Sequence, residues 1–202
     1  MVGRMAEMVD LGPAASRLSD LVKGIGDDQL GLPTPCGGRT VGDILDHVGG
    51  LALGFAAAAT KDLGPITATP PTPDGTRLGP AWREEIPDQV TRLARVWRDP
   101  VAWEGMTQVG GVSLPGEVAG RIALNEAVLH AWDLARATGQ PHEQDHRSLE
   151  VCMASLAVMY PPEDLERRQG IFGPPVEVPR DSSLVDRVVA FSGRDPGWHG
   201  LG

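Results

Sequence analysis

The chain has 202 residues, 41% of them hydrophobic, and a formal net charge of −9, as expected for one soluble globular domain. The acidic balance and the lack of a basic stripe argue against nucleic acid and anionic membranes as partners. Two cysteines, Cys36 and Cys152, are too few for a disulfide framework or a zinc–thiolate site. No apolar run predicts a membrane span and the N-terminal residues lack a signal-peptide pattern, so we expect a cytoplasmic protein.

Three amphipathic helices are predicted in the first half of the chain. Apolar residues recur at helical spacing over residues 5–24, from 41 to about 59, and over 82–97. Thr40 is a typical N-cap for the second of these helices, and Asp43 lies three residues further on, as in a capping box.

Segments rich in proline and glycine connect these helices. Residues 30–38 are predicted to form a loop, and residues 62–79 a long exposed loop. A loop of that length is either mobile or functional, and covering a pocket is one function open to it. Residues 103–113 are rich in glycine and predict short extended pieces.

The longest helical stretch of the second half covers residues 114–139. It begins near a proline and ends at a glycine, the usual pattern at the two ends of a helix. Two further helices are predicted over about 147–160 and over 183–191, with at best a short extended segment at 170–179.

Helices therefore dominate, and the sequence has no internal repeat and no sustained heptad. We predict an all-α fold in which residues 1–202 form a single domain. Its bundle core occupies about residues 5–160, and residues 161–202 form a C-terminal extension with a short closing helix.

Two candidate metal ligands lie on one face of the helix predicted at 114–139. Glu126 and His130 are four residues apart, so their side chains lie one above the other, and Asp133 falls on the same side. The rest of this face is small or apolar, where a carboxylate and an imidazole are costly to bury without a partner. A metal ion is the obvious partner, and His47 is the candidate third ligand. Two imidazoles and a carboxylate form the ligand set of hydrolytic zinc sites and non-haem iron sites.

Each of these residues also has a purely structural interpretation. Glu126 can lie near the surface, while His130 or His47 can be a core histidine bonded to a backbone carbonyl. Asp133 either accepts a hydrogen bond that orients a ligand imidazole, or is a carboxylate that is exposed or paired with Arg136.

Three other residues invite a functional interpretation. Cys36 precedes the helix that starts at Val41, and a helix N-terminus can lower the pKa of a thiol, although a structural loop thiol is the simpler interpretation. His142 and His146 are four apart in a polar stretch, where we expect solvated side chains.

Longer motifs carry a family resemblance. TPCGGRTVGDILDHVGG resembles the second-helix motif of the mycothiol-dependent maleylpyruvate isomerase-like family, within the DinB-like superfamily of metal-binding bundles. NEAVLHAWDLARATGQ is similar to the metal-binding helix of that family, and FSGRDPGW to the C-terminus of a short actinobacterial branch. The resemblance covers residues 5–198 and implies an up-down-down-up four-helix bundle.

The resemblance also implies a site and its cofactors. His47, Glu126 and His130 match the positions that bind a divalent ion in the family, usually Zn²⁺, with Ni²⁺ and Fe²⁺ as alternatives. Mycothiol is the implied co-substrate, and a small electrophile is the implied substrate. The resemblance leaves open whether the chain forms a homodimer. Arg39 stands where tryptophan is common, and the chain is short for the C-terminal domain of the larger isomerases, so substrate specificity does not carry over.

Three functions remain open from the sequence. The first is a metal- and thiol-dependent enzyme of isomerase or S-transferase type. The second is a non-catalytic module that binds metal or a small ligand, in stress response or storage. The third is a structural all-α protein whose polar residues are satisfied by hydrogen bonds.

Overall fold

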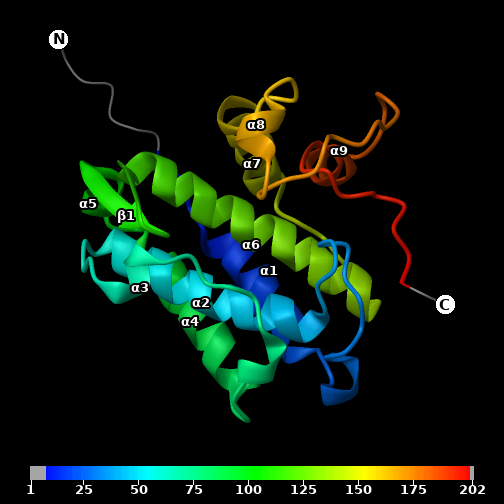
Figure 1. Cartoon of the computed structure of the whole chain (residues 1–202), viewed down its shortest axis with the longest axis horizontal. Helices are drawn as coiled ribbons and strands as arrows, with labels where there is room; N and C mark the ends of the chain where they lie inside the picture. The colour runs from blue at the N-terminus through cyan, green and yellow to red at the C-terminus, as the bar shows by residue number, and fades with distance from the viewer. Residues whose placement is uncertain (1–7, 201–202) are drawn as a thin grey trace.

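The computed structural model describes residues 8–200, and its centre is a bundle of four helices (Figure 1). α1 and α2 each pack against both α4 and α6, which places α1 diagonally opposite α2. The all-α, up-down-down-up bundle predicted from the sequence is confirmed. The four helices are α1 (Gly12–Lys23), α2 (Val41–Ala59), α4 (Trp82–Val96) and α6 (Gly116–Thr138).

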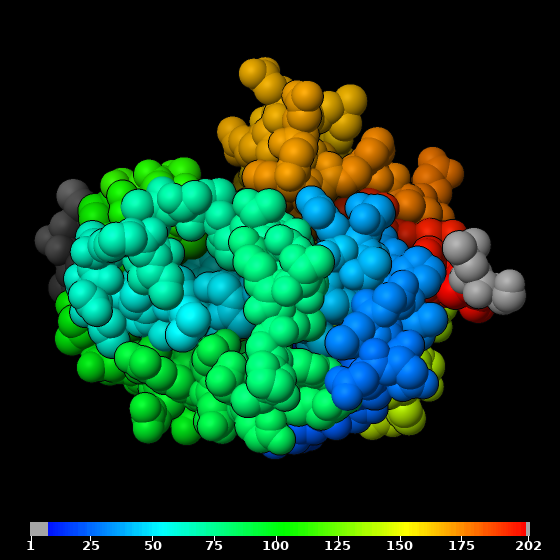
Figure 2. Space-filling view, turned by 60° about the horizontal axis from the view of Figure 1, so that its bottom comes forward, coloured from blue at the N-terminus to red at the C-terminus, as the bar shows by residue number. Residues whose placement is uncertain are grey.

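Short elements connect the bundle helices. An antiparallel hairpin of β1 (Met106–Val109) and β2 (Val112–Pro115) leads into α6. The segment between α2 and α4 lies across α2, and we call residues 69–79 the strap (Figure 2). The other connecting elements are η1 (Asp27–Gln29), α3 (Pro65–Ala68), η2 (Gly75–Arg77) and α5 (Pro100–Trp103).

The C-terminal extension packs on the outer side of α6 (Figure 1). α7 (His146–Met159) precedes it and contacts α6, and the extension itself contains α8 (Leu165–Arg168) and α9 (Leu184–Phe191), which contacts α7. The guanidinium of buried Arg168 donates hydrogen bonds to the carbonyl oxygens of Tyr160, Gly173 and Phe191. One side chain therefore ties together the turns that bring the chain back toward the bundle.

Two buried tryptophans position α6 against its neighbours. Trp97 Nε1 donates to the carbonyl oxygen of Phe55 at 3.1 Å, and Trp103 Nε1 donates to the carbonyl oxygen of Trp97 at 2.7 Å. Gly120 of α6 lies against both rings, and a Cβ there would come within 2.7 Å of Trp103. The absence of a side chain at this position therefore allows α6 to approach the indoles.

α2 carries the strongest apolar character of the site-bearing elements. By length and composition alone it could cross a membrane, which the sequence analysis did not anticipate. Its buried residues include Ile44, Leu45 and Phe55, which belong to the hydrophobic core of the bundle. Its N-terminus has the predicted capping box: Asp43 N donates to Thr40 Oγ1 at 3.2 Å, and Thr40 N donates to Asp43 Oδ2 at 2.9 Å.

The structure corrects two of the predicted segments. The first helix begins at Gly12, with Pro13 in its first turn, and residues 8–11 are not helical; Met5 lies outside the described residues. Residues 62–79 are not one exposed loop, because α3 and η2 form within them. Thr67 is buried there and its hydroxyl donates to Gln108 Oε1 at 3.1 Å, which fixes α3 against the hairpin.

Removing the cap of α2 should destabilise the fold measurably. We expect Thr40→Ala to lower the free energy of unfolding by about 1 kcal/mol, because both hydrogen bonds between the Thr40 hydroxyl and Asp43 are lost. Urea denaturation checks this value, with Ser16→Ala, an exposed change within α1, as the control. Equal effects of the two substitutions would show that the capping box does not stabilise α2.

Candidate metal centre

Three side chains from two facing helices meet in the bundle. His47 comes from α2, while Glu126 and His130 come from successive turns of α6. Their potential ligand atoms all lie within 4.8 Å of one another. His130 Nε2 lies 3.0 Å from Glu126 Oε2, and the two imidazole rings meet edge to face with centroids 5.2 Å apart. The residues that the sequence singled out are therefore neighbours in space.

The other ring nitrogen of each histidine is held by an acceptor outside this cluster. Nδ1 of His47 lies 3.1 Å from the carbonyl oxygen of Pro71 in the strap, and Nδ1 of His130 lies 2.9 Å from Asp133 Oδ2. An oxygen acceptor at Nδ1 requires a proton on that nitrogen, so the free lone pair of a neutral ring is on Nε2. Both rings are therefore oriented with Nε2 as the available ligand atom, the pattern seen in metal-binding histidines.

Asp133 is held by an arginine from the far end of the chain. Its side chain is fully buried, and Arg194, which follows α9, donates to both carboxylate oxygens at 2.7 and 2.9 Å. Arg194 also donates to Ser192 Oγ at 3.0 Å. Asp133 therefore bonds His130 rather than facing solvent or Arg136, whose guanidinium donates to the carbonyl oxygen of Pro196 instead.

The charges of this cluster shift its pKa values in opposite directions. Burial acts to lower the pKa of His130, but its bonds to Asp133 and Glu126 outweigh burial and raise the pKa to about 9. Burial acts to raise the pKa values of Glu126 and Asp133, but the charges of His130 and Arg194 hold both below their usual range. Burial, followed by the nearby His130, lowers the pKa of His47. Without a metal ion, the cluster therefore pairs a charged His130 with two carboxylates and a neutral His47.

A hollow of about 660 Å³ opens onto this cluster. The strap forms one wall, and the turn at residues 170–173 of the C-terminal extension forms another, so the predicted pocket-covering segment does line a pocket. Arg39 and Cys36 lie at its edge. Burial raises the pKa of the Cys36 thiol to about 11, the opposite of the lowering that a helix N-terminus would produce. Cys36 Sγ also lies within 4.8 Å of potential ligand atoms of His130 and Asp133.

The remaining candidate histidines behave differently from one another. His146 is exposed, as predicted, and lies 3.6 Å from Glu150. The prediction of a solvated His142 is wrong: both of its ring nitrogens are buried without a hydrogen-bond partner among the described residues. Burial, with the charges of Arg17 and Arg136, lowers its pKa to about 4. Its loop is held against the bundle because Gln140 and Gln144 donate to carbonyl oxygens of α1 and α6.

The sequence analysis missed two groups that support the cluster. Pro71 contributes a backbone carbonyl, which no residue type can reveal. Arg194 lies within FSGRDPGW, a motif that the resemblance had singled out without giving any residue in it a role. That motif was therefore the feature of the sequence from which a role for Arg194 could have been suspected.

Comparison with known families assigns most of the chain to one of them. A family model described as the mycothiol maleylpyruvate isomerase N-terminal domain matches residues 11–135. The chain belongs to this family. The matched region contains His47, Glu126, His130 and Asp133, whereas Arg194 lies beyond it.

Individual relatives agree with this assignment. An uncharacterized protein of Mycobacterium tuberculosis strain H37Rv is 30% identical over 191 residues, which cover 90% of this chain and 93% of that protein, and one from strain CDC 1551 gives the same values. The crystal structure of the mycothiol-dependent maleylpyruvate isomerase matches with a TM-score of 0.58 and 21% identity over 76% of this chain and 70% of that chain. A mutant of that isomerase matches with the same TM-score and 20% identity. At such identities the likeness shows a common fold.

Metal-free protein should lose stability as the pH rises from about 6.5 to about 9. Because the pKa of His130 is raised on folding, its charge stabilises the fold fully below pH 6.5, and this contribution is lost as the pH passes through about 9. The loss is on the order of 3 kcal/mol. Urea unfolding of chelator-treated protein measures it. His130→Gln should flatten the profile and His146→Gln should leave it unchanged; a flat wild-type profile would contradict a charged His130.

Proposed function

We propose that this protein binds a divalent metal ion through His47, Glu126 and His130 and uses a small thiol to convert a small electrophile. The observation that carries the proposal is that Nε2 of both imidazoles and the Glu126 carboxylate meet in one cluster, while each Nδ1 is held elsewhere. Family membership supports mycothiol as the thiol, since the family is named for a mycothiol-dependent isomerase. The cytoplasm is the compartment that we propose for this chemistry.

The donor set fits a borderline metal ion. Two imidazole nitrogens and one carboxylate leave open positions for a further ligand, which favours Zn²⁺, with Ni²⁺ and Fe²⁺ as alternatives. The hydrogen bonds from Nδ1 to Asp133 and to the Pro71 carbonyl would orient the ligand rings and raise their basicity. When bound, such an ion supplies positive charge that favours the thiolate form of a thiol.

The residues of the hollow would then bring the thiol and the electrophile together. Its volume of about 660 Å³ lies within the range of small-molecule sites. Apolar side chains such as Ile44, Leu129 and Phe172 are part of its lining. In an isomerisation, the sulfur adds to an electrophilic double bond, rotation follows, and the carbon–sulfur bond breaks again, so the thiol is regenerated. In a transfer, a carbon–sulfur bond forms while a leaving group departs with its electron pair.

Metal binding should depend on His47 and not on the exposed His146. We expect about one equivalent of zinc in gently purified protein. His47→Ala should reduce the affinity by more than the roughly 10- to 100-fold that loss of a supporting hydrogen bond costs, because it removes a ligand. Mass spectrometry of the bound metal and competition with a chromogenic chelator measure these values. Occupancy below about 0.2 equivalents in the wild type, or equal losses in His47→Ala and His146→Ala, would refute the metal site.

Thiol chemistry should depend on the same metal ion. With mycothiol present, zinc-loaded protein should convert a member of a panel of unsaturated diacids or alkylating electrophiles, detected by chromatography. His47→Ala should reduce turnover to the rate of the uncatalysed reaction, while His146→Ala should retain it. Full zinc occupancy without thiol-dependent turnover would refute the enzyme proposal for that panel and leave the metal site standing.

A further inference from the structure

A further hollow lies where α6, α7 and α9 meet, outside the metal centre. α7 contacts both α6 and α9, and these helices lie on the side of the bundle that carries the C-terminal extension (Figure 1). The hollow has a volume of about 550 Å³. We call it the arginine hollow, because Arg121 of α6, Arg147 of α7 and Arg187 of α9 all line it. None of the three candidate metal ligands is part of its lining, so the two sites are separate.

The lining of the arginine hollow is positively charged, although the chain is acidic. Among the described residues, its three arginines face a single carboxylate, that of Glu150, whereas the whole chain has a net charge of −9. With His146 neutral, the lining therefore has two positive charges in excess. A concave surface lined by one sign of charge attracts and concentrates ions of the other sign. The ligand that suits this hollow is an anion with more than one negative charge.

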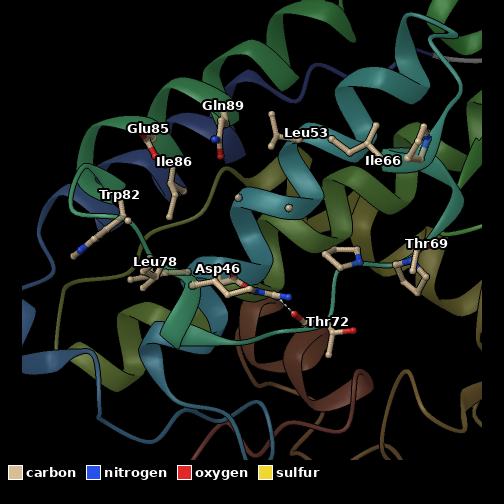
Figure 3. Close-up of a pocket in the computed structure, with 18 residues that line it drawn as sticks. Asp46, Leu53, Ile66, Thr69, Thr72, Leu78, Trp82, Glu85, Ile86 and Gln89 are labelled. Atoms are coloured by element: carbon tan, nitrogen blue, oxygen red, sulfur yellow. Dashed lines mark hydrogen bonds and ion pairs between the residues drawn. The ribbon is translucent and has the colours of Figure 1, made fainter.

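A hollow of similar size between α2, α4 and the strap has no such excess (Figure 3). Its volume is about 530 Å³, and Arg77, its one arginine among the described residues, donates to Asp46 Oδ2 at 2.6 Å. Glu85 is the remaining charged residue of that lining, which therefore has one negative charge in excess. The positive excess thus distinguishes the arginine hollow from a hollow of comparable volume.

Two of the arginines keep N–H donors for a ligand. Nη2 of Arg121 lies 3.5 Å from Glu117 Oε1, which is longer than the roughly 2.7–2.9 Å of a hydrogen bond between charged groups. The side chain of Arg187 has no hydrogen bond or ion pair with a described residue. A guanidinium carries five N–H donors, and its planar fork fits two oxygens of one phosphate or carboxylate. Both side chains can therefore bind an oxyanion without first giving up a strong partner.

The lining is open to a ligand from solvent and also has an apolar part. The side chains of Arg121 and Arg147 are 23% and 59% exposed, and Arg187 is exposed as well. Met153 of α7 and Leu184 of α9 are half-buried and line the same hollow. An organic group attached to the anion would therefore contact apolar surface.

We propose that the arginine hollow binds a small organic phosphate, that is, a phosphomonoester. Such a group carries about −1.5 to −2 charges at neutral pH and three acceptor oxygens, which matches the excess of positive charge. Arg121 and Arg187 would donate to the phosphate oxygens, Arg147 would add its charge, and the organic part would lie against Met153 and Leu184. This inference does not depend on the metal site or on the proposed reaction.

Four probes separate the charge, the phosphate group and the organic part. At a pH of about 7.5, phenyl phosphate is a dianion, phenyl sulfate is a monoanion of similar shape, phenylmalonate is a dicarboxylate, and inorganic phosphate lacks the ring. Isothermal titration of zinc-loaded protein should show one equivalent of phenyl phosphate bound, more tightly than each of the other three. Added salt should weaken its binding, because the arginines are partly exposed.

Matched variants test the arginines. Arg187→Gln and Arg121→Gln should each weaken phenyl phosphate binding about fivefold, and the double variant about 25-fold. Neither change removes a side-chain hydrogen bond between described residues, so both variants should keep the fold. Arg95→Gln is the control, because Arg95 is exposed on α4 and does not line the hollow. His47→Ala should leave the binding unchanged, because His47 lines only the metal hollow.

The outcomes separate the proposal from its alternatives. Phenyl sulfate or phenylmalonate binding as tightly as phenyl phosphate, or equal effects of Arg187→Gln and Arg95→Gln, would overturn the proposal. Equally tight binding of inorganic phosphate would overturn the organic part of the ligand. Phenyl phosphate binding that is lost in His47→Ala but kept in the double arginine variant would place the probe at the metal centre, which also overturns the proposal. Loss of zinc in the wild type would refute the metal proposal without affecting this titration.

Discussion

The burial of Asp133 in the middle of α6 is the constraint that the rest of this structure satisfies. A carboxylate with no exposed surface is strongly unfavourable unless charged donors surround it. His130 supplies one donor from the preceding turn of the same helix, and Arg194 supplies two from a position 61 residues further along the chain. The C-terminal extension must therefore fold back across α6, and Arg168 holds its turns in the shape that allows this.

A second set of bonds holds the strap on α2. Asp43 accepts from Gly75 N at 2.9 Å while it also closes the capping box, and Asp46 bonds Arg77 and the backbone of Asp74. His47, one residue further on, bonds the carbonyl oxygen of Pro71. Three acidic or imidazole side chains within one turn and a half of α2 thus hold the strap in place. The ring orientation of His47 depends on the last of these contacts.

The parts that could be predicted from the sequence are those governed by local spacing. Helical periodicity located the bundle helices, the Thr40 and Asp43 pair located the start of α2, and the four-residue spacing placed Glu126 beside His130. Contacts between distant segments were not predictable in this way. Arg194 reaches Asp133 from another element, and His142 is buried because its loop is bound to two helices. His47 was a candidate third ligand by residue type, and only the resemblance to a family favoured this over a core histidine, since nothing local to α2 distinguishes the two.

The same arrangement holds the cluster together without a bound ion. With His130 protonated, its two N–H groups point at Asp133 and Glu126, so the imidazolium itself occupies the space between the carboxylates. A proton on Nε2 and a metal ion bound to Nε2 exclude each other, and both place positive charge beside Glu126. The bond to Asp133 is made through Nδ1 and persists in either state. The orientation of the ring is therefore fixed by folding, through Asp133 and Arg194, and not by the ion that the ring would receive.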